Sequence, residues 1–136
     1  MLVLLLRVGD RRYGLAAHDV VEVVPCVPLR PAPGAPLWVA GLLPHRDGCA
    51  PVIDLTQLLT GAAAAPLLST RLVLLRRGDG GLIALRAEGV TGLTRVDAAA
   101  ADGAIALEDG GSAQLVGWTD LVPAALHASL TAVAPP

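Results

Sequence analysis

The feature that most constrains the fold is a series of short apolar runs, each closed by turn-forming residues. Runs of Leu, Val and Ile recur every eight to twelve residues or so, a spacing typical of small barrels and sandwiches. Gly-Asp-Gly-Gly at 78–81 and Glu-Asp-Gly-Gly-Ser at 108–112 separate four of the runs. Both are strong hairpin signals, because Gly and Asp adopt the backbone angles that tight turns need. The pattern predicts a mainly β chain.

We expect strands over residues 2–8, 12–17, 20–24, 37–43, 50–55, 71–77, 82–87, 89–96, 104–107 and 113–118. The valine-rich 20–24 run surrounds Glu22 and is interpreted as a strand, or as one helical turn passing into a strand. Prolines recur from residue 25 to residue 36, which excludes regular structure there. This segment must therefore cross the surface between elements.

Only two short helices are expected. Asp54 precedes the first, over residues 55–59, and its carboxylate can accept from free amides in the first turn. Thr119 or Asp120 would cap the second, with Pro123 in its first turn, where no amide partner is lost. Each helix follows an apolar strand through an Asp-Leu pair. This internal echo is what a doubled small-barrel architecture would produce.

Composition narrows the classes of function. A chain of 136 residues is one domain, or two small lobes that share a core. The net charge of −2 and an aromatic content of 2% disfavour nucleic-acid binding. The longest uncharged stretch, residues 55–70, contains Gly61 and Pro66 and is no membrane span. The apolar N-terminus is too short for a signal-peptide core, so we expect a cytoplasmic protein without membrane insertion.

One group of residues carries a chemical alternative. His45, Asp47 and Cys49 alternate along the chain, and metal binding or Cys-His nucleophile chemistry uses these residue types. Yet Pro44 and Gly48 predict a turn over residues 44–48, and no second ligand cluster lies elsewhere. We therefore expect no enzyme, no metal and no cofactor. Glu22 is interpreted either as the solvent-facing position of an alternating strand or as part of a binding surface.

Three segments carry a resemblance to a known family. They are YGLAAHDVVEVVP (13–25), APLWVAGLLPHRDGCAPVIDL (35–55) and RLVLLRRGDGGLIALRAEGVTGL (71–93). They contain V-x-E-V-like, W-V-x-G-L and P-V-x-D-L motifs at the expected spacing. On these residues the chain resembles the CheW-like domain, the coupling protein of bacterial chemosensory arrays.

The resemblance implies a fold of two small SH3-like five-stranded β-barrels that share a hydrophobic interface, with one or two short helices. We expect a single such domain over residues 1–131 and a frayed tail over 132–136. The resemblance also implies a noncatalytic adaptor. Its partners would be the cytoplasmic tips of chemoreceptors and the regulatory domain of a CheA-type histidine kinase, which has the same fold.

The chain departs from the family pattern at one turn. Where the family has N-L-R-G, this chain has Arg46 at the Arg position, but Pro44 replaces Asn and Asp47 occupies the Gly site, with Gly48 displaced by one. Asp reaches positive φ less readily than Gly, so the turn is expected to be reshaped. The family's V-D-x-V segment reads Ala-Glu-Gly-Val over residues 87–90.

The resemblance implies a set of partner-binding residues. Arg46 and His45 would supply polar contacts at a rim. A groove would be lined by Val20, Glu22 and Val23, with Leu43 and Trp38 beneath it. Two alternatives remain open besides the chemical site at His45, Asp47 and Cys49: a specialised scaffold that binds one partner only, and a homo-oligomer formed through open barrel edges.

Overall fold

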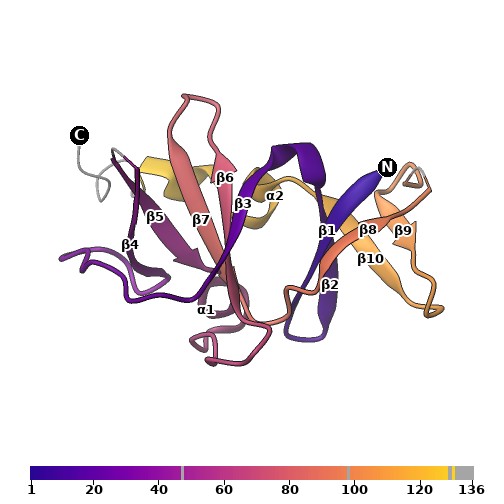
Figure 1. Cartoon of the computed structure of the whole chain (residues 1–136), viewed down its shortest axis with the longest axis horizontal. Helices are drawn as coiled ribbons and strands as arrows, with labels where there is room; N and C mark the ends of the chain where they lie inside the picture. The colour runs from indigo at the N-terminus through magenta and orange to yellow at the C-terminus, as the bar shows by residue number, and fades with distance from the viewer. Residues whose placement is uncertain (47, 98, 129, 131–136) are drawn as a thin grey trace.

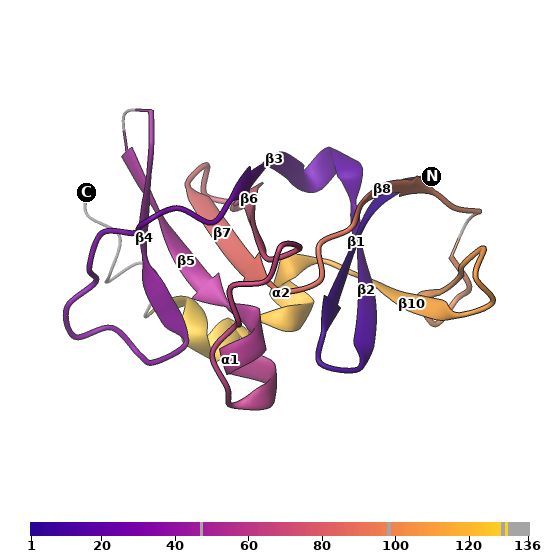
Figure 2. The same ribbon diagram turned by 60° about the horizontal axis from the view of Figure 1, so that its bottom comes forward.

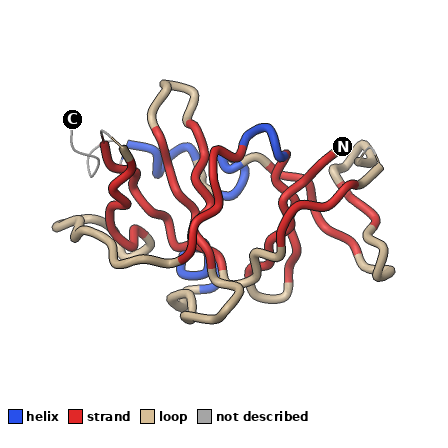
Figure 3. The backbone as a smooth tube through the Cα atoms, viewed as in Figure 1, coloured by secondary structure: helices blue, strands red, loops and turns tan. Residues whose placement is uncertain are grey.

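The computed structural model describes residues 1–46, 48–97, 99–128 and 130, and it shows two lobes side by side (Figure 1). In the described residues each lobe is a five-stranded sheet. One has the order β3-β6-β7-β5-β4, all from the middle of the chain, and is called the middle barrel. The other has the order β8-β1-β2-β10-β9, from both ends of the chain, and is called the terminal barrel. Figure 3 shows that loops connect most of the strands.

The strands of the terminal barrel are β1 (Leu2–Val8), β2 (Arg11–Ala16), β8 (Gly92–Arg95), β9 (Ala104–Ala106) and β10 (Ser112–Val116). Those of the middle barrel are β3 (Val20–Pro25), β4 (Val39–His45), β5 (Gly48–Asp54), β6 (Arg71–Arg76) and β7 (Leu82–Ala87). Each barrel contains one parallel pair, β2 with β10 and β5 with β7, and its other pairs are antiparallel.

Side chains alternate between two cores along the strands where the barrels meet. In β6, Leu72 and Leu74 point into the middle barrel, whereas Val73 and Leu75 belong to a larger cluster. In β1, Val3 points into the terminal barrel, and Leu4, Leu6 and Val8 join the same larger cluster. Because a strand presents successive residues to opposite faces, each barrel has its own interior and both share the third core. The expected fold class is confirmed.

The helices lie where the barrels join (Figure 2). They are the α-helices α1 (Leu55–Thr60) and α2 (Trp118–Leu121) and the 3-10 helices η1 (Ala17–Asp19) and η2 (Ala124–Leu126). The whole valine-rich 20–24 run lies in β3, so of its two interpretations the strand is correct, and the single turn of η1 precedes it. None of the helices in the described ranges has the length and hydropathy to span a bilayer.

Asp54 caps α1 as predicted, with its Oδ1 accepting from the Gln57 amide at 3.1 Å. The expectation for the final helix is wrong. It begins at Trp118 with Gly117 as its N-cap, and Asp120 reaches back from inside the first turn to accept from the Gly117 amide at 2.7 Å. Pro123 does not lie in that first turn but caps η2. The tail expected to fray, residues 132–136, lies outside the described residues.

Candidate protein-binding site at the edges of the middle barrel

The two outer strands of the middle barrel approach each other through two side chains. Glu22 on β3 and His45 at the end of β4 are 3.4 Å apart, from Oε2 to Nε2. The His45 side chain is only 16% exposed, whereas that of Glu22 is 51% exposed. The predicted rim residue His45 is therefore packed beside Glu22, where it bridges two strands that make no sheet pairing with each other.

The register of β3 divides the predicted groove residues between two faces. Glu22 pairs with Leu74, which points into the middle barrel, while Val23 pairs with Val73, which belongs to the shared core. Val20 also packs against the shared core. Paired residues on antiparallel strands share a face, so Val20 and Val23 lie on the opposite face of the sheet from Glu22. A bulge between Val20 and Glu22 produces this switch.

The two residues expected beneath the groove are separated in the same way. Leu43 is buried inside the middle barrel. Trp38 is half-buried against the shared core. The structure thus brings Glu22 close to His45, with Leu43 below in the barrel interior. Val20 and Trp38 pack against the shared core, whereas Val23 is exposed.

The turn between β4 and β5 is tighter than expected. Residues 44–48 do not form the predicted loop, because Pro44 and His45 continue β4 and His45 pairs directly with Gly48. Proline is tolerated there since β4 is an outer strand. The loop is left with two residues, and Arg46 at its first position has φ 51°. A positive φ at this position suits the turns that close two-residue hairpins.

Arg46 is exposed, and its side chain makes no hydrogen bond or ion pair with any residue that the structure describes. Positive φ had been expected at Asp47, the position of the family's glycine. Asp47 lies outside the described residues, so its place beside Arg46 stays a prediction. Arg46 thus lies in the turn of the hairpin, directly after His45, which contacts Glu22.

The chemical alternative does not gain support from the hairpin geometry. Cys49 pairs with Pro44, so its side chain points to the opposite face from that of His45. The Cys49 Sγ lies 3.8 Å from Nη1 of Arg30, on the segment between β3 and β4. Asp47, the third member, is outside the described residues. Within the described ranges, no three His, Cys, Asp or Glu side chains are grouped as metal ligands would be.

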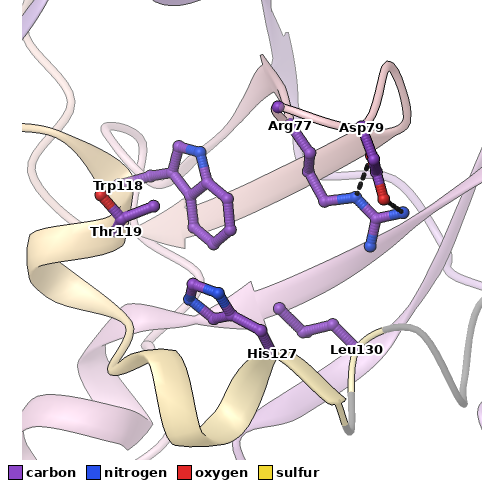
Figure 4. Close-up of a pocket in the computed structure, with 7 residues that line it drawn as sticks. Arg77, Asp79, Trp118, Thr119, His127 and Leu130 are labelled. Atoms are coloured by element: carbon purple, nitrogen blue, oxygen red, sulfur yellow. Dashed lines mark hydrogen bonds and ion pairs between the residues drawn. The ribbon is translucent and has the colours of Figure 1, made fainter.

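A separate cavity of about 260 Å³ lies beside α2 (Figure 4). Trp118 and His127 line it with their rings in contact, at a centroid distance of 4.8 Å, and His127 Nε2 lies 2.9 Å from the Val122 carbonyl oxygen. On the other side the Arg77 guanidinium pairs with Asp79 at 3.1 Å. A hydrogen bond from the Gly81 amide, together with Arg77, lowers the pKa of Asp79. The cavity is smaller than most ligand sites, which exceed about 300 Å³, and its charged groups pair with each other.

Comparison with known proteins identifies the family to which this chain belongs. The model of the CheW-like domain family matches residues 2–122. The chain belongs to this family. It is therefore a CheW-like domain.

Two individual proteins are similar to this CheW-like domain. The crystal structure of scaffolding protein TtCheW from Thermoanaerobacter tengcongensis superposes with a TM-score of 0.72 over 90% of this chain and 92% of that chain. Its sequence identity of 19% makes this a likeness of fold. Protein FrzA of Myxococcus xanthus is 38% identical over 58 residues, which are 43% of this chain and 36% of FrzA. The matched segment thus spans little more than a third of that relative.

Two family motifs have structural roles that the sequence did not reveal. In the P-V-x-D-L motif, Asp54 also accepts from Arg86 Nη2 at 2.7 Å and from the Ala64 amide at 3.0 Å. In the W-V-x-G-L motif, Gly41 has φ 151°, and a Cβ built on it would lie 2.7 Å from the Arg30 carbonyl oxygen. This close approach lets the segment between β3 and β4 pair with β4, where Arg30 and Leu42 exchange two 2.8 Å hydrogen bonds. The spacing of the motifs contains no signal for either partner.

Proposed function

We propose that this CheW-like domain is a noncatalytic adaptor that couples the cytoplasmic tips of chemoreceptors to the regulatory domain of a CheA-type histidine kinase. The observation that carries the proposal is the family match over residues 2–122, together with a fold shared with a scaffolding protein. An adaptor of this kind works in the cytoplasm and needs surfaces, not reactive groups. Signalling then depends on how the bound partners shift the populations of kinase states.

The edges of the middle barrel supply one such surface. β3 and β4 are its outer strands, and Arg46 projects from the hairpin that ends β4. Polar groups on outer strands and an unpaired cation can be satisfied by a partner, and an arginine at such a place is a frequent binding hot spot. Around it Glu22 and His45 form the polar rim, and the exposed valines of β3 add apolar area. A stable interface would bury about 800 Å² on each partner.

The departures in the turn bear on whether the domain binds one partner or both. Pro44 removes a backbone donor from the outer strand where the family has Asn, and the loop that follows has only two residues. A partner that contacts the family's Asn side chain would lose that contact here. We expect binding to both partners to depend on Arg46. A domain that binds only one of the two partners would be a specialised scaffold.

The test is a pull-down of the purified domain against a receptor cytoplasmic hairpin and against a CheA-type regulatory domain, separately. Arg46→Glu should leave the thermal transition unchanged and weaken binding. Arg76→Glu, which reverses an exposed arginine on β6, is the matched control and should bind normally. Equal binding of the wild type and Arg46→Glu to both partners would reject this site. Binding of the wild type to neither, with self-association at rising concentration, would favour the homo-oligomer.

A further inference from the structure

The loop after α1 exposes the most solvent-accessible large apolar side chain in the described part of the chain. Leu68 is 96% exposed and its neighbour Leu67 is 49% exposed. Figure 1 shows this loop, residues 61–70, at the lower edge of the molecule beside α1. Neither leucine belongs to one of the hydrophobic cores. Because both side chains are exposed and lie outside the cores, they add little to the stability of the fold and leave an apolar surface open to a partner.

Hydrogen bonds from the barrels fix the course of this loop. The Ala64 amide donates to Asp54 at 3.0 Å, and the Ala65 amide donates to Glu88 Oε1 at 2.8 Å. Farther along, the Val90 amide donates to the Ser69 carbonyl at 3.1 Å. The anchors therefore come from β5 and from the turn after β7.

Bonds within the loop hold its tip as well. The buried Thr70 hydroxyl donates to the Ala65 carbonyl at 2.6 Å and accepts from the Leu67 amide at 3.1 Å. The Arg71 guanidinium donates to the carbonyl of Leu68. Because the backbone is already ordered on both sides of the two leucines, a partner would not need to order it on binding, which removes a large part of the usual entropy cost.

A basic recess begins directly beside the leucines. It has a volume of about 200 Å³ and is lined by Leu5, Leu6, Arg7, Arg12, Ser69, Gly89 and Thr91. Ser69, which lines the recess, directly follows Leu68 in the chain, so the exposed leucines lie on the loop that borders the recess. Arg7 and Arg12 are cross-strand partners on β1 and β2, so both side chains leave the sheet on the same face, and both line the recess.

The two arginines differ in what they contact. Arg12 Nη1 pairs with Asp109 at 2.7 Å. Arg7 is exposed, and its side chain has no hydrogen-bond or ion-pair partner within the described residues. Among the residues that the structure describes, no carboxylate lines the recess itself. The recess thus offers an unneutralised cation and two hydroxyl-bearing residues next to a fixed apolar tip.

We propose that Leu67, Leu68 and this recess form a second docking surface, separate from the edges of the middle barrel. The positive charge of the recess indicates what binds there. The partner is a segment of another protein that packs a large apolar side chain on the two leucines and places an Asp or Glu carboxylate on Arg7. A carboxylate fits a guanidinium through two parallel hydrogen bonds, which gives geometric selectivity as well as attraction.

The experiment selects short random peptides on the immobilised domain and measures the affinity of enriched peptides by fluorescence polarisation. Enriched sequences should combine an acidic residue with a neighbouring Leu, Ile, Phe or Trp. Leu68→Ser and Arg7→Gln should each weaken their binding about tenfold, the loss expected for one anchor residue. The matched controls are Leu37→Ser, another highly exposed leucine, and Arg76→Gln, another exposed arginine, and both should bind like the wild type.

Three results would overturn the proposal. The first is a selection that enriches no peptide, or enriches peptides without acidic residues. The second is unchanged affinity in Leu68→Ser and Arg7→Gln, with thermal melts showing that both variants fold. The third is self-association of the wild type that Leu68→Ser abolishes, which would make the occupant a second copy of this chain. None of these outcomes depends on receptor or kinase binding through Arg46.

Discussion

The middle barrel and the terminal barrel repeat one construction. In the middle barrel β5 forms the parallel pair and leads into α1, and in the terminal barrel β10 forms the parallel pair and leads into α2. In both, an aspartate accepts a hydrogen bond from a backbone amide at the start of the helix: Asp54 from Gln57, and Asp120 from Gly117. The weak sequence echo of strand, Asp-Leu and helix therefore corresponds to a real structural repeat.

The two aspartates nevertheless differ in their burial and in how many segments they connect. Asp54 is 2% exposed and joins the helix start, the loop after α1 and Arg86 on β7. Asp120 is exposed, and the one hydrogen bond shown for it is local. The same sequence motif thus serves as a buried junction in one barrel and as a surface cap in the other. The contribution of each aspartate to the free energy of unfolding depends on its burial and on its number of partners, and not on the motif.

The first way to test this contrast is Asp54→Ala against Asp120→Ala. Removing Asp54 leaves Arg86 without its carboxylate in a largely buried place and removes the cap of α1. We expect a loss of about 3 kcal/mol in the free energy of unfolding, at the low end of the range for broken buried pairs because the Arg86 side chain is 26% exposed. Asp120→Ala should cost under about 1 kcal/mol. Urea unfolding measures both.

A matched variant separates the two roles of Asp54. Asp54→Asn keeps an oxygen that can cap α1 but removes the negative charge beside Arg86, so its stability should lie between those of the wild type and Asp54→Ala. Equal losses for Asp54→Ala and Asp120→Ala would show that the two barrels do not differ in the way their structures indicate.

The second test compares one glycine of each barrel, because the atoms that an added Cβ would meet differ between the two. Gly41→Ala would put a Cβ 2.7 Å from the Arg30 carbonyl at φ 151°, so both backbone strain and a backbone clash oppose it. We expect a loss of about 2 kcal/mol. Gly14→Ala in the terminal barrel has its one tight contact with the end of the Ile105 side chain, at 3.1 Å, and that side chain can shift, while Val3 lies at an ordinary contact distance of 3.6 Å. Thermal unfolding should therefore show the smaller loss for Gly14→Ala.

Much of this architecture could be predicted from the sequence. Strand positions follow from apolar runs and turn residues, both of which are local, and the cap at Asp54 follows from its place before a helix. Errors occur where cross-strand pairing decides the structure, because the apolar pattern does not show which residues pair. The extension of β4 to His45 depends on pairing with Gly48 across a two-residue turn, and a proline before that turn had suggested a loop.

The candidate site was harder to predict for the same reason. The bulge in β3 sends Glu22 to one face and Val23 to the other, and no property of the valine-rich run indicates where such a bulge falls. The partners of Asp54 and Glu88 in the loop after α1 are set by the tertiary fold. Exposure of Leu68 is likewise invisible in a sequence where most leucines are buried.

The third test asks whether the hairpin tip of the middle barrel is shaped for binding at the expense of stability. Arg46 has φ 51°, which costs roughly 1–2 kcal/mol for a residue other than Gly. Arg46→Gly removes this strain but adds freedom to the unfolded chain, so stability should stay equal or rise by up to about 1 kcal/mol. Partner binding should fall at the same time. A variant that loses stability would show that the Arg46 side chain supports the fold instead.

The smallest effect is expected at the two Asp-Gly-Gly hairpins, and it concerns acid. The Arg12 guanidinium and the Gly111 amide lower the pKa of Asp109, while the Gly81 amide and Arg77 lower the pKa of Asp79. A carboxyl whose pKa is lower in the folded state stabilises the fold above about pH 4, the ordinary value, and this contribution disappears as the pH falls through the lower folded value.

Both aspartates are at the surface, so Asp109→Asn and Asp79→Asn should change unfolding midpoints only slightly at neutral pH. They should also flatten the fall in stability between about pH 4 and pH 2. Asp109 ties the β9–β10 hairpin to β2, whereas Asp79 contacts only its own hairpin. Asp109→Asn should therefore have the larger effect, and salt should reduce it because the pair is exposed. An equal effect of both variants would mean that the exposed pair adds nothing to the closure of the terminal barrel.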